Sequence, residues 1–373
     1  MSESLIKLTR GVPPEESFPV DQLQTCADYV LLVHGYEVLQ YGKSRGYPKL
    51  RELIAEGQGV DASRVIVGQG SLQLQDLCAR MLVNPGDVVY VEEPTYDRAL
   101  TILERAGAQV VGFPLEEDGI DVEAVEKGLK AGNRPIFFYL IPDFQNPSGT
   151  LLSEAKRRRI LELSHAYDFW VIEDVPYRRL RYRGKDRPSL FDLGEDRVLQ
   201  MSSYSKLISP GLRVGYVIAP EPLAGRLAKM AEDTYINASY LNQAIVADFI
   251  RRGWLSSQIE ELKGLYEPRL YATLKALEEH VGDLATWPEP DGGFFVGVIL
   301  NETLNTDELL GRAEKVNLAL TDGRGFFVNR VNGNGFVRLP FCALTPDEIH
   351  EGVARLGNVV RALMSSSDVS RDL

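Results

Sequence analysis

A lysine with phosphate-binding neighbours offers the clearest chemistry in the sequence. Lys206 lies in SSYSKLISPGLRVGY between Ser203 and Ser205, and Arg213 follows it seven residues later. A lone lysine in a loop is ordinarily solvated, but serine hydroxyls and a guanidinium together suit a phosphate group. A lysine amine can form a Schiff base with a carbonyl compound. The segment therefore predicts a site for a phosphorylated aldehyde.

Other polar residues follow the apolar runs that precede them. Asp174 ends FWVIED, Asn146 follows PIFFYLI within PDFQNPSG, and Tyr96 follows VVYVE within EEPTYDRA. A buried carboxylate is costly unless it is paired, and the carboxyl edge of an open α/β sheet is where ligands bind. Taken singly, Asp174 could cap a turn, Asn146 could belong to a plain loop, and Tyr96 could simply pack.

A further phosphate site is predicted at Gly70-Ser71-Leu72, between the run VIVG and a helical pattern. The first N–H groups of a helix are unpaired and favour anions, although Ser71 could merely cap the helix. Two nucleotide motifs fail nearby. Gly42-Lys43-Ser44 lacks the earlier glycine of a phosphate-binding P-loop, and Gly68-x-Gly70 lacks the third glycine of a dinucleotide fingerprint.

The elements that must position these residues form a regular rhythm. Short apolar runs alternate with helical patterns, which predicts βαβ units and a mostly parallel sheet with helices on both faces. The seven expected strands are VIVG, VVYVE, QVVGFPL, PIFFYLIP, FWVIED, VLQMSS and RVGYVIAP. We expect an α/β fold with an N-terminal segment at 1–40 that contributes to the small domain and the active site. A large cofactor-binding domain at 41–255 and a smaller α+β domain at 256–373 follow it.

In that C-terminal part, GGFFVGVIL, GFFVNRV and GFVRLPF are expected strands and TPDEIHEGVARLGNVVRALM a helix. A long helical stretch is expected through EDTYINASYLNQAIVADFIRRG and SSQIEELKGLYEPRLYATLKALEEHV.

The amino-acid composition restricts the kinds of binding partner that are expected. The formal charge is 41 − 53 = −12, which argues against nucleic acid and anionic membranes. Three cysteines without a Cys-x-x-Cys motif predict neither a disulfide framework nor a zinc site, and no metal is expected among the scattered histidines. No signal peptide or membrane span is visible, so a cytoplasmic setting is expected.

Phosphate donors, a carboxylate for a ring nitrogen, an aromatic ring and a lysine for an aldehyde together describe pyridoxal 5'-phosphate (PLP). The order Tyr96…Asn146…Asp174…Tyr177…Lys206…Arg213…Arg338 resembles that of the fold-type I PLP enzymes, specifically the class I/II aminotransferases. PDFQNPSGT, VIEDVPY, SYSKLISPGLRVGY and PDGGFF are similar to the branch with α-aminoadipate and kynurenine aminotransferases and the catalytic domains of MocR regulators.

The resemblance implies the site roles. Lys206 would form the Schiff base and move the Cα proton, Asp174 would pair with the pyridine nitrogen, and Tyr96 would stack on the ring. The other implied cofactor contacts are Gly70, Ser71, Leu72, Asn146, Tyr177, Ser203, Ser205 and Arg213, together with Tyr41 from a neighbouring subunit. The implied substrate contacts are Arg338, Asn146 and Gly11. A homodimer with shared active sites follows, with an amino acid and a 2-oxo acid as small-molecule partners.

The resemblance favours transfer of the α-amino group of an L-amino acid to a 2-oxo acid. A PLP-dependent lyase or cyclase, catalysing β- or γ-elimination, replacement or side-chain cyclisation, would use the same residues and remains an alternative. A PLP-binding regulatory module is a minor alternative. Such regulators carry a DNA-binding domain before the PLP domain, whereas the resemblance to the PLP domain begins within the first residues of this sequence. One departure concerns Leu72, which replaces a glutamine of the family's phosphate turn. Its backbone N–H is retained, but a side-chain contact would be lost.

Overall fold

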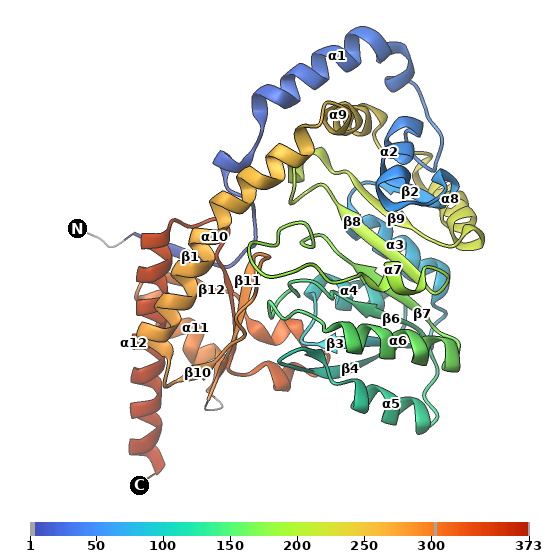
Figure 1. The fold of residues 1–373 in the computed structure, drawn as a ribbon. Helices are drawn as coiled ribbons and strands as arrows, with labels where there is room; N and C mark the ends of the chain where they lie inside the picture. Colours follow the sequence, from blue (N-terminus) through green and yellow to red (C-terminus); the bar gives the residue numbers. More distant parts are fainter. Residues whose placement is uncertain (1–3, 302–303, 372–373) are drawn as a thin grey trace.

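The structure, a computed structural model, describes residues 4–301 and 304–371. A large sheet forms its centre (Figure 1), and all seven predicted strands belong to this sheet. In spatial order its strands are β2 (Val65–Gly68), β9 (Gly215–Ile218), β8 (Val198–Ser203), β7 (Trp170–Asp174), β6 (Pro135–Leu140), β3 (Val88–Glu93), β4 (Gln109–Glu116) and β5 (Gly119–Ile120).

The sheet is mostly parallel, as predicted. Strands β4, β3, β6, β7 and β8 run parallel to their neighbours in that series, whereas β9 is antiparallel to both β8 and β2. The short β5 pairs antiparallel with β4 at the edge and adds an eighth strand that the sequence did not suggest. The parallel strands therefore all end at one edge, where loops carry the polar residues singled out above.

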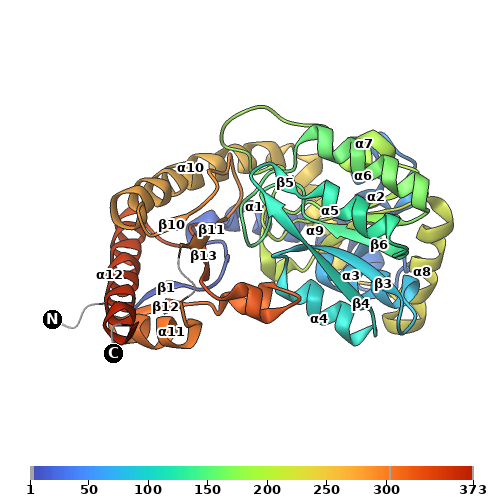
Figure 2. The same cartoon turned by 90° about the horizontal axis from the view of Figure 1, so that it is seen from below.

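Helices cover both faces of this sheet (Figure 2), which explains why its strands are apolar runs without alternation. One layer contains α3 (Ser71–Leu82), α4 (Asp97–Arg105) and α8 (Glu221–Tyr235). The opposite layer contains α2 (Pro48–Gln58), α5 (Val122–Lys130), α6 (Glu154–Tyr167), α7 (Leu190–Gly194) and α9 (Tyr240–Arg251). Successive strand residues face different layers: Phe138 packs with the second layer and Tyr139 with the first.

The C-terminal part packs beside the large sheet. Helix α10 (Trp254–Val281) runs from the neighbourhood of α9 to α12 (Pro346–Arg371) (Figure 1). Two small sheets join them, β10 (Ala285–Thr286) with β11 (Phe295–Leu300) and β13 (Phe336–Pro340), and β1 (Ile6–Leu8) with β12 (Leu318–Leu320). Helix α11 (Thr306–Lys315) lies in the same region. Within the described residues, no helix has the length and apolar character needed to cross a membrane.

Two expectations need correction, and one helix was missed. The predicted strand GFFVNRV is wrong, because this segment forms two short 3-10 helices, Gly323–Phe326 and Arg330–Gly333. Asp322 caps the first of them by accepting a hydrogen bond from the backbone N–H of Arg324. The long helical stretch after residue 230 is broken, because α8 ends before Ile236 (φ 67°) and Ser239 caps α9. Helix α1 (Val20–Val38) was not predicted at all.

Candidate active site

The polar residues chosen from the sequence gather at the carboxyl edge of the large sheet. Asp174 is the last residue of β7, Lys206 follows β8, and Asn146 lies in the loop after β6. Tyr96 follows β3 and directly precedes α4, while Ser71 begins α3 just after β2. These residues lie at the ends of strands or in the loops and helix starts that follow them, so the sheet fixes the positions of their backbones.

Lys206 is partly buried, and its amine points into the protein. Its Nζ donates a hydrogen bond to the carbonyl oxygen of Gly11 at 2.9 Å and lies 5.5 Å from the ring centre of Phe294. No carboxylate pairs with it among the described residues. Burial lowers the pKa of Lys206, and the charges of Arg338, Arg213 and Arg10 act in the same direction. Such an amine is more readily deprotonated than an ordinary lysine, as a nucleophile or base requires.

Asp174 is buried and only half satisfied. Its Oδ2 accepts a hydrogen bond from the hydroxyl of Tyr139 at 2.9 Å, whereas its Oδ1 has no partner among the described residues. Burial raises the pKa of Asp174 to about 7, and the Tyr139 hydrogen bond opposes that rise. A buried carboxylate oxygen without a donor is costly, so this atom indicates a missing cationic N–H group.

A cradle for an anion lies beside Lys206. Ser203 and Ser205 exchange a hydroxyl hydrogen bond of 2.8 Å, and Arg213 donates to Ser205 Oγ at 3.5 Å and to the Gln69 carbonyl at 3.0 Å. Gly70 has φ 83°, and a Cβ there would lie 2.4 Å from Arg213 Nη2. A glycine is therefore required where the α3 N-terminus meets the guanidinium.

A Cβ at Gly215 would lie 2.4 Å from the backbone nitrogen of Ser71, so this wall of the cradle is made of main chain. Leu72 is partly buried and packs against the α3–α4–α8 layer. Its backbone N–H belongs to the first turn of α3, where N–H groups lack intrahelical partners.

Arg338 belongs to strand β13, and its guanidinium contacts the loops that carry Asn146 and Thr9. Its Nη1 donates to Asn146 Oδ1 at 3.1 Å and its Nη2 to the Thr9 carbonyl at 2.7 Å, while its Nε has no partner among the described residues. The guanidinium lies 4.8 Å and 4.5 Å from the ring centres of Phe295 and Phe326. It has no ion-pair partner in the described part of the chain. A buried guanidinium without a carboxylate is suited to bind one from a ligand.

Two tyrosines lie close to these groups. Burial raises the pKa of Tyr96 to about 12, and the charges of Asp174 and Arg338 also affect this hydroxyl. Burial also raises the pKa of Tyr177, whose ring packs 5.4 Å from that of Phe294. Both hydroxyls are therefore protonated and can donate a hydrogen bond. Tyr41 differs, because it is 77% exposed and contacts none of these residues within the chain.

Several contacting residues were missed in the sequence. Tyr139 contacts Asp174, Thr9 contacts Arg338, and Phe294 faces Lys206. A tyrosine inside the apolar run PIFFYLI was the available signal for the first. The Thr9 carbonyl lies 329 residues from its partner, and no local pattern identifies it.

The histidines are less scattered than the sequence suggested. His280 and His350 approach with their Nε2 atoms 3.1 Å apart, and Glu279 Oε2 lies 3.0 Å from His350 Nε2. This exposed cluster joins α10 to α12, away from the carboxyl edge that carries Lys206.

The residues fit PLP on three observations of the structure. A desolvated amine at Lys206 suits an aldehyde, and the unpartnered Oδ1 of Asp174 suits a protonated ring nitrogen. The hydroxyls of Ser203 and Ser205, Arg213 and the first turn of α3 suit a phosphate. These groups converge on one edge of one sheet.

The model of the aminotransferase class I and II family matches residues 3–356. The chain belongs to this family. It is 34% identical to an aromatic-amino-acid aminotransferase of Thermococcus litoralis, over 97% of the chain and 89% of that protein. It superposes on the multiple substrate aminotransferase of Thermococcus profundus with a TM-score of 0.94 and 33% identity, over 98% of the chain and 93% of that structure.

A third relative concerns the cofactor. The α-aminoadipate aminotransferase of Thermus thermophilus, solved with N-(5'-phosphopyridoxyl)-L-leucine, superposes with a TM-score of 0.91 at 33% identity, over 97% of the chain and 93% of that structure. The chain is thus a PLP-dependent aminotransferase of fold type I. The lyase or cyclase alternative gains no support from these relatives. Transcriptional regulators also match this aminotransferase, at 29–31% identity.

Proposed function

We propose that the aminotransferase works with Lys206 as the residue that bonds the cofactor and moves the Cα proton. The desolvated Nζ, held by the Gly11 carbonyl without any acid partner among the described residues, is the observation that carries this role. PLP, when bound, supplies an electron sink for the pair left by the broken Cα–H bond. No carboxylate of the described residues pairs with the Lys206 amine, so the amine can accept that proton.

The surrounding residues are assigned roles from their own chemistry. Asp174 would hold a cationic ring nitrogen through its free Oδ1. Asn146 and Tyr177 would donate to the ring oxygen, and Tyr96 would cover the ring face. Arg338 would bind the α-carboxylate of the amino acid, since its guanidinium is buried without an acid partner in the described chain.

The phosphate group is assigned to the cradle at the start of α3. Its contacts would be the backbone N–H groups of Gly70, Ser71 and Leu72, the hydroxyls of Ser203 and Ser205, and the Arg213 guanidinium. Gly11 would position substrate and lysine, because a Cβ there would lie 2.3 Å from the Phe295 ring.

We further propose a homodimer in which the partner subunit's Tyr41 completes the phosphate site. The exposed face of α1 and its continuation supports this, because large apolar side chains cluster there: Val20, Leu31, Leu32, Val33, Tyr36, Leu39 and Tyr41 are 46–101% exposed. Such a patch is unusual on a solvated helix and indicates a protein contact. The Tyr41 side chain is 77% exposed and therefore available to a neighbouring subunit.

A mixing experiment tests this shared site. Subunits carrying Lys206→Ala and subunits carrying Tyr41→Ala would each be poorly active alone. A mixed dimer contains one site with both residues intact, so activity should rise when the two are refolded together. Failure of the mixture to recover any activity would contradict the shared site and leave the role of Lys206 standing.

We propose three parts for the chain: 1–40, a large domain at 41–255 and a small domain at 256–373. All strands of the large sheet fall within 65–218, and α10 begins at Trp254. A cytoplasmic setting is proposed because the cysteines Cys26, Cys78 and Cys342 are free and buried.

The function is tested by a spectrum and an assay. Purified protein with PLP should absorb in the visible, and an amino acid with 2-oxoglutarate should yield the matching keto acid. Lys206→Ala should lose both. Wild-type protein that stays colourless with added PLP would contradict the proposed roles.

A further inference from the structure

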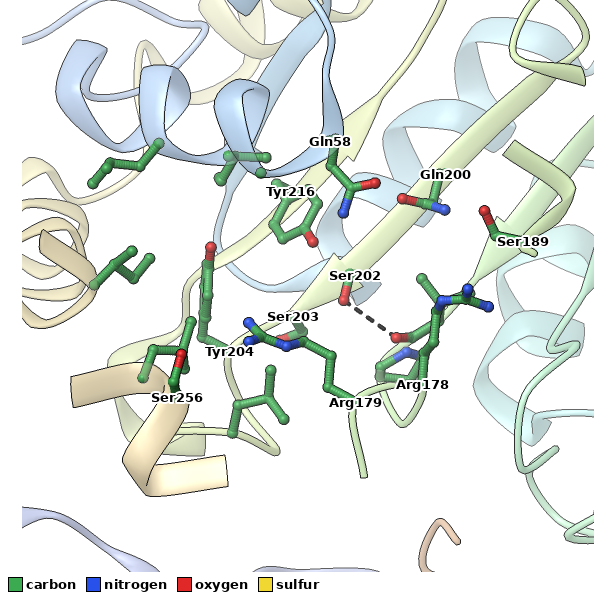
Figure 3. Close-up of a pocket in the computed structure, with 18 of the residues that line it drawn as sticks. Gln58, Arg178, Arg179, Ser189, Gln200, Ser202, Ser203, Tyr204, Tyr216 and Ser256 are labelled. Carbon is green, nitrogen blue, oxygen red and sulfur yellow. Dashed lines mark hydrogen bonds between the residues drawn. The ribbon is translucent and has the colours of Figure 1, made fainter. Parts of the chain in front are cut away.

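A second pocket lies on the opposite face of the sheet from the Asp174 side chain. Along β8, Met201 packs with the α3–α4–α8 layer, so Gln200 and Ser202 face the other layer. There a pocket of about 460 Å³ opens between the end of α2, the loop after β7, strands β8 and β9, and the start of α10 (Figure 3). Lys206, Asp174 and Arg338 do not line it. Its size is that of small-molecule sites.

One side of this pocket is formed by a basic segment, YRRLRYRGKDR at 177–187. Most of its arginines are already paired. Arg178 contacts Asp143 and Asp192, and Arg181 contacts Asp186 and Asp291. These two cations are therefore neutralised by the protein itself.

Arg179 behaves differently from its neighbours. No ion pair or hydrogen bond of its side chain is found in the described part of the chain, and its guanidinium extends into the pocket toward Tyr204 (Figure 3). Arg179 is exposed, so its guanidinium is open both to solvent and to a ligand in this pocket. A guanidinium without an acid partner can bind an anionic ligand.

Tyr204 provides a second, independent indication of a ligand. The residue is only 6% exposed, and no hydrogen bond of its hydroxyl is found within the described residues. Its hydroxyl points into the pocket, near Tyr216 of β9, with ring centres 5.8 Å apart (Figure 3). Burial raises the pKa of Tyr204, and the Arg179 charge acts weakly against it. The hydroxyl is therefore a protonated donor without an acceptor.

The rest of the pocket lining is mixed. Leu53 and Ile54 of α2, Leu207, Ile250 and Leu255 supply apolar side chains, and Gln58, Ser189, Asp192, Gln200, Ser202 and Ser256 supply polar ones. The carboxylate of Asp192 is already paired with Arg178. A charged donor, a hydroxyl and several aliphatic side chains around one pocket suit an anion with an apolar body. Inorganic phosphate would leave the aliphatic wall without a partner.

We propose that this pocket is a second binding site, for a small organic carboxylate with an apolar body. The carboxylate pairs with Arg179 and accepts a hydrogen bond from the Tyr204 hydroxyl, and the apolar body packs against Leu53, Ile54 and Leu255. Ser203, which is proposed to contact the cofactor phosphate, also lines this pocket, but no residue proposed to bond the cofactor ring or the α-carboxylate does. The occupant is therefore not a transamination substrate.

The occupant would contact the turn that carries Lys206. Tyr204 directly precedes Ser205, and its carbonyl accepts hydrogen bonds from the N–H groups of Leu207 at 3.2 Å and Ile208 at 2.8 Å. A carboxylate held at the Tyr204 hydroxyl therefore contacts the same turn from the opposite side of the sheet.

Calorimetric titration of the holoenzyme with phenylacetate tests the proposal, because this probe has no amino or keto group to react. Arg338→Gln removes the α-carboxylate site proposed above and isolates the second site. In that background we expect one bound equivalent, and Arg179→Gln should weaken its binding by roughly tenfold or more. Tyr204→Phe should weaken it less, and Arg179→Lys should retain part of it. Arg183→Gln, which removes an exposed and ion-paired arginine of the same segment, is the matched control.

The outcomes separate the alternatives. Loss of all binding in Arg338→Gln, or unchanged binding in Arg179→Gln, would overturn the second site. Tighter binding of inorganic phosphate than of phenylacetate would overturn the carboxylate assignment. If Arg338→Gln does not fold, the number of equivalents bound by wild type, two against one in Arg179→Gln, decides the question.

Discussion

Two neighbouring acids on β7 show how the scaffold and the catalytic edge differ. Glu173 faces α7 and is saturated: it accepts hydrogen bonds from the N–H groups of Leu190 and Phe191 and from Gln200 Nε2, at 2.7, 3.1 and 2.9 Å. Asp174 faces the other layer and has one oxygen without a donor among the described residues. Both are buried, and only the second is incomplete. At this edge of the sheet, the unsatisfied oxygen of Asp174 is suited to a donor from a ligand.

The cations repeat this contrast. Arg157 is completely buried, with Asp143 and three backbone carbonyls around it. Arg338 is also buried but has only an amide and a carbonyl oxygen as acceptors within the described chain. Lys156 contacts two carboxylates and Lys206 contacts none among the described residues. The scaffold cations are paired with acids of the chain, whereas Arg338 and Lys206 have no acid partner among the described residues. This difference is what the proposed binding of cofactor and substrate requires.

The largest effect is expected for Lys206→Ala. Transamination should fall by roughly a thousandfold or more, because the change removes the group that is proposed to move the proton. The unfolding free energy of the cofactor-free protein should not fall, since a desolvated amine is removed. Steady-state assays and urea unfolding measure the two effects. In Lys156→Ala we expect the unfolding free energy to fall and the activity to be retained. A loss of activity comparable to that of Lys206→Ala would contradict the difference between the two lysines.

Breaking the scaffold pair should act on stability instead. Arg157→Met leaves Asp143 buried without its main partner and should lower the unfolding free energy by about 3–5 kcal/mol. Arg338→Gln removes an arginine that has no acid partner in the described chain and should cost far less stability. Chemical unfolding of both cofactor-free variants measures these changes. Equal losses of unfolding free energy would show that the two arginines contribute to stability in the same way.

The pH dependence of stability distinguishes Asp174. Because burial raises its pKa to about 7, the folded cofactor-free protein keeps a proton that the unfolded chain releases near pH 4. This contribution is present at low pH and is lost as pH rises toward 7. Asp174→Asn should therefore gain stability relative to wild type over this range, by up to roughly 1.4 kcal/mol per pH unit. A difference that stays constant with pH would rule out the raised pKa.

The smallest effect is expected for Tyr139→Phe. The change removes the one hydrogen bond to Asp174 found in the described chain and so disfavours the carboxylate that would hold the ring nitrogen. PLP affinity should fall by up to about tenfold, the equivalent of one hydrogen bond. A cofactor titration followed in the visible measures it, with Tyr90→Phe, another buried tyrosine of the sheet, as control. An equal loss in the control would indicate a packing effect.

The sheet could be predicted from the sequence because its strands are buried on both faces and appear as uninterrupted apolar runs. Helix α1 could not, because it buries only Cys26, Val30 and Val38, which give a weak helical pattern. The segment 325–331 has strand-like residues, but tertiary packing decides its shape: a Cβ at Gly323 would lie 2.0 Å from the carbonyl oxygen of Phe336.

The site residues on strand ends were visible as polar residues after apolar runs, and the family resemblance assigned their roles. What the sequence hides are contacts across long separations. Gly11 was expected to bind substrate, yet its carbonyl contacts Lys206 from 195 residues away. The unsatisfied Oδ1 of Asp174 is likewise a property of three-dimensional packing and has no sequence signal.

Borohydride reduction of the PLP-bound protein, followed by peptide mass spectrometry, tests the central claim most directly. Reduction fixes the cofactor to the lysine that holds it. The account predicts a pyridoxyl-phosphate adduct on the peptide that contains Lys206, and none on Lys156. An adduct on another lysine, or an unmodified Lys206 after full reduction of a coloured protein, would contradict it.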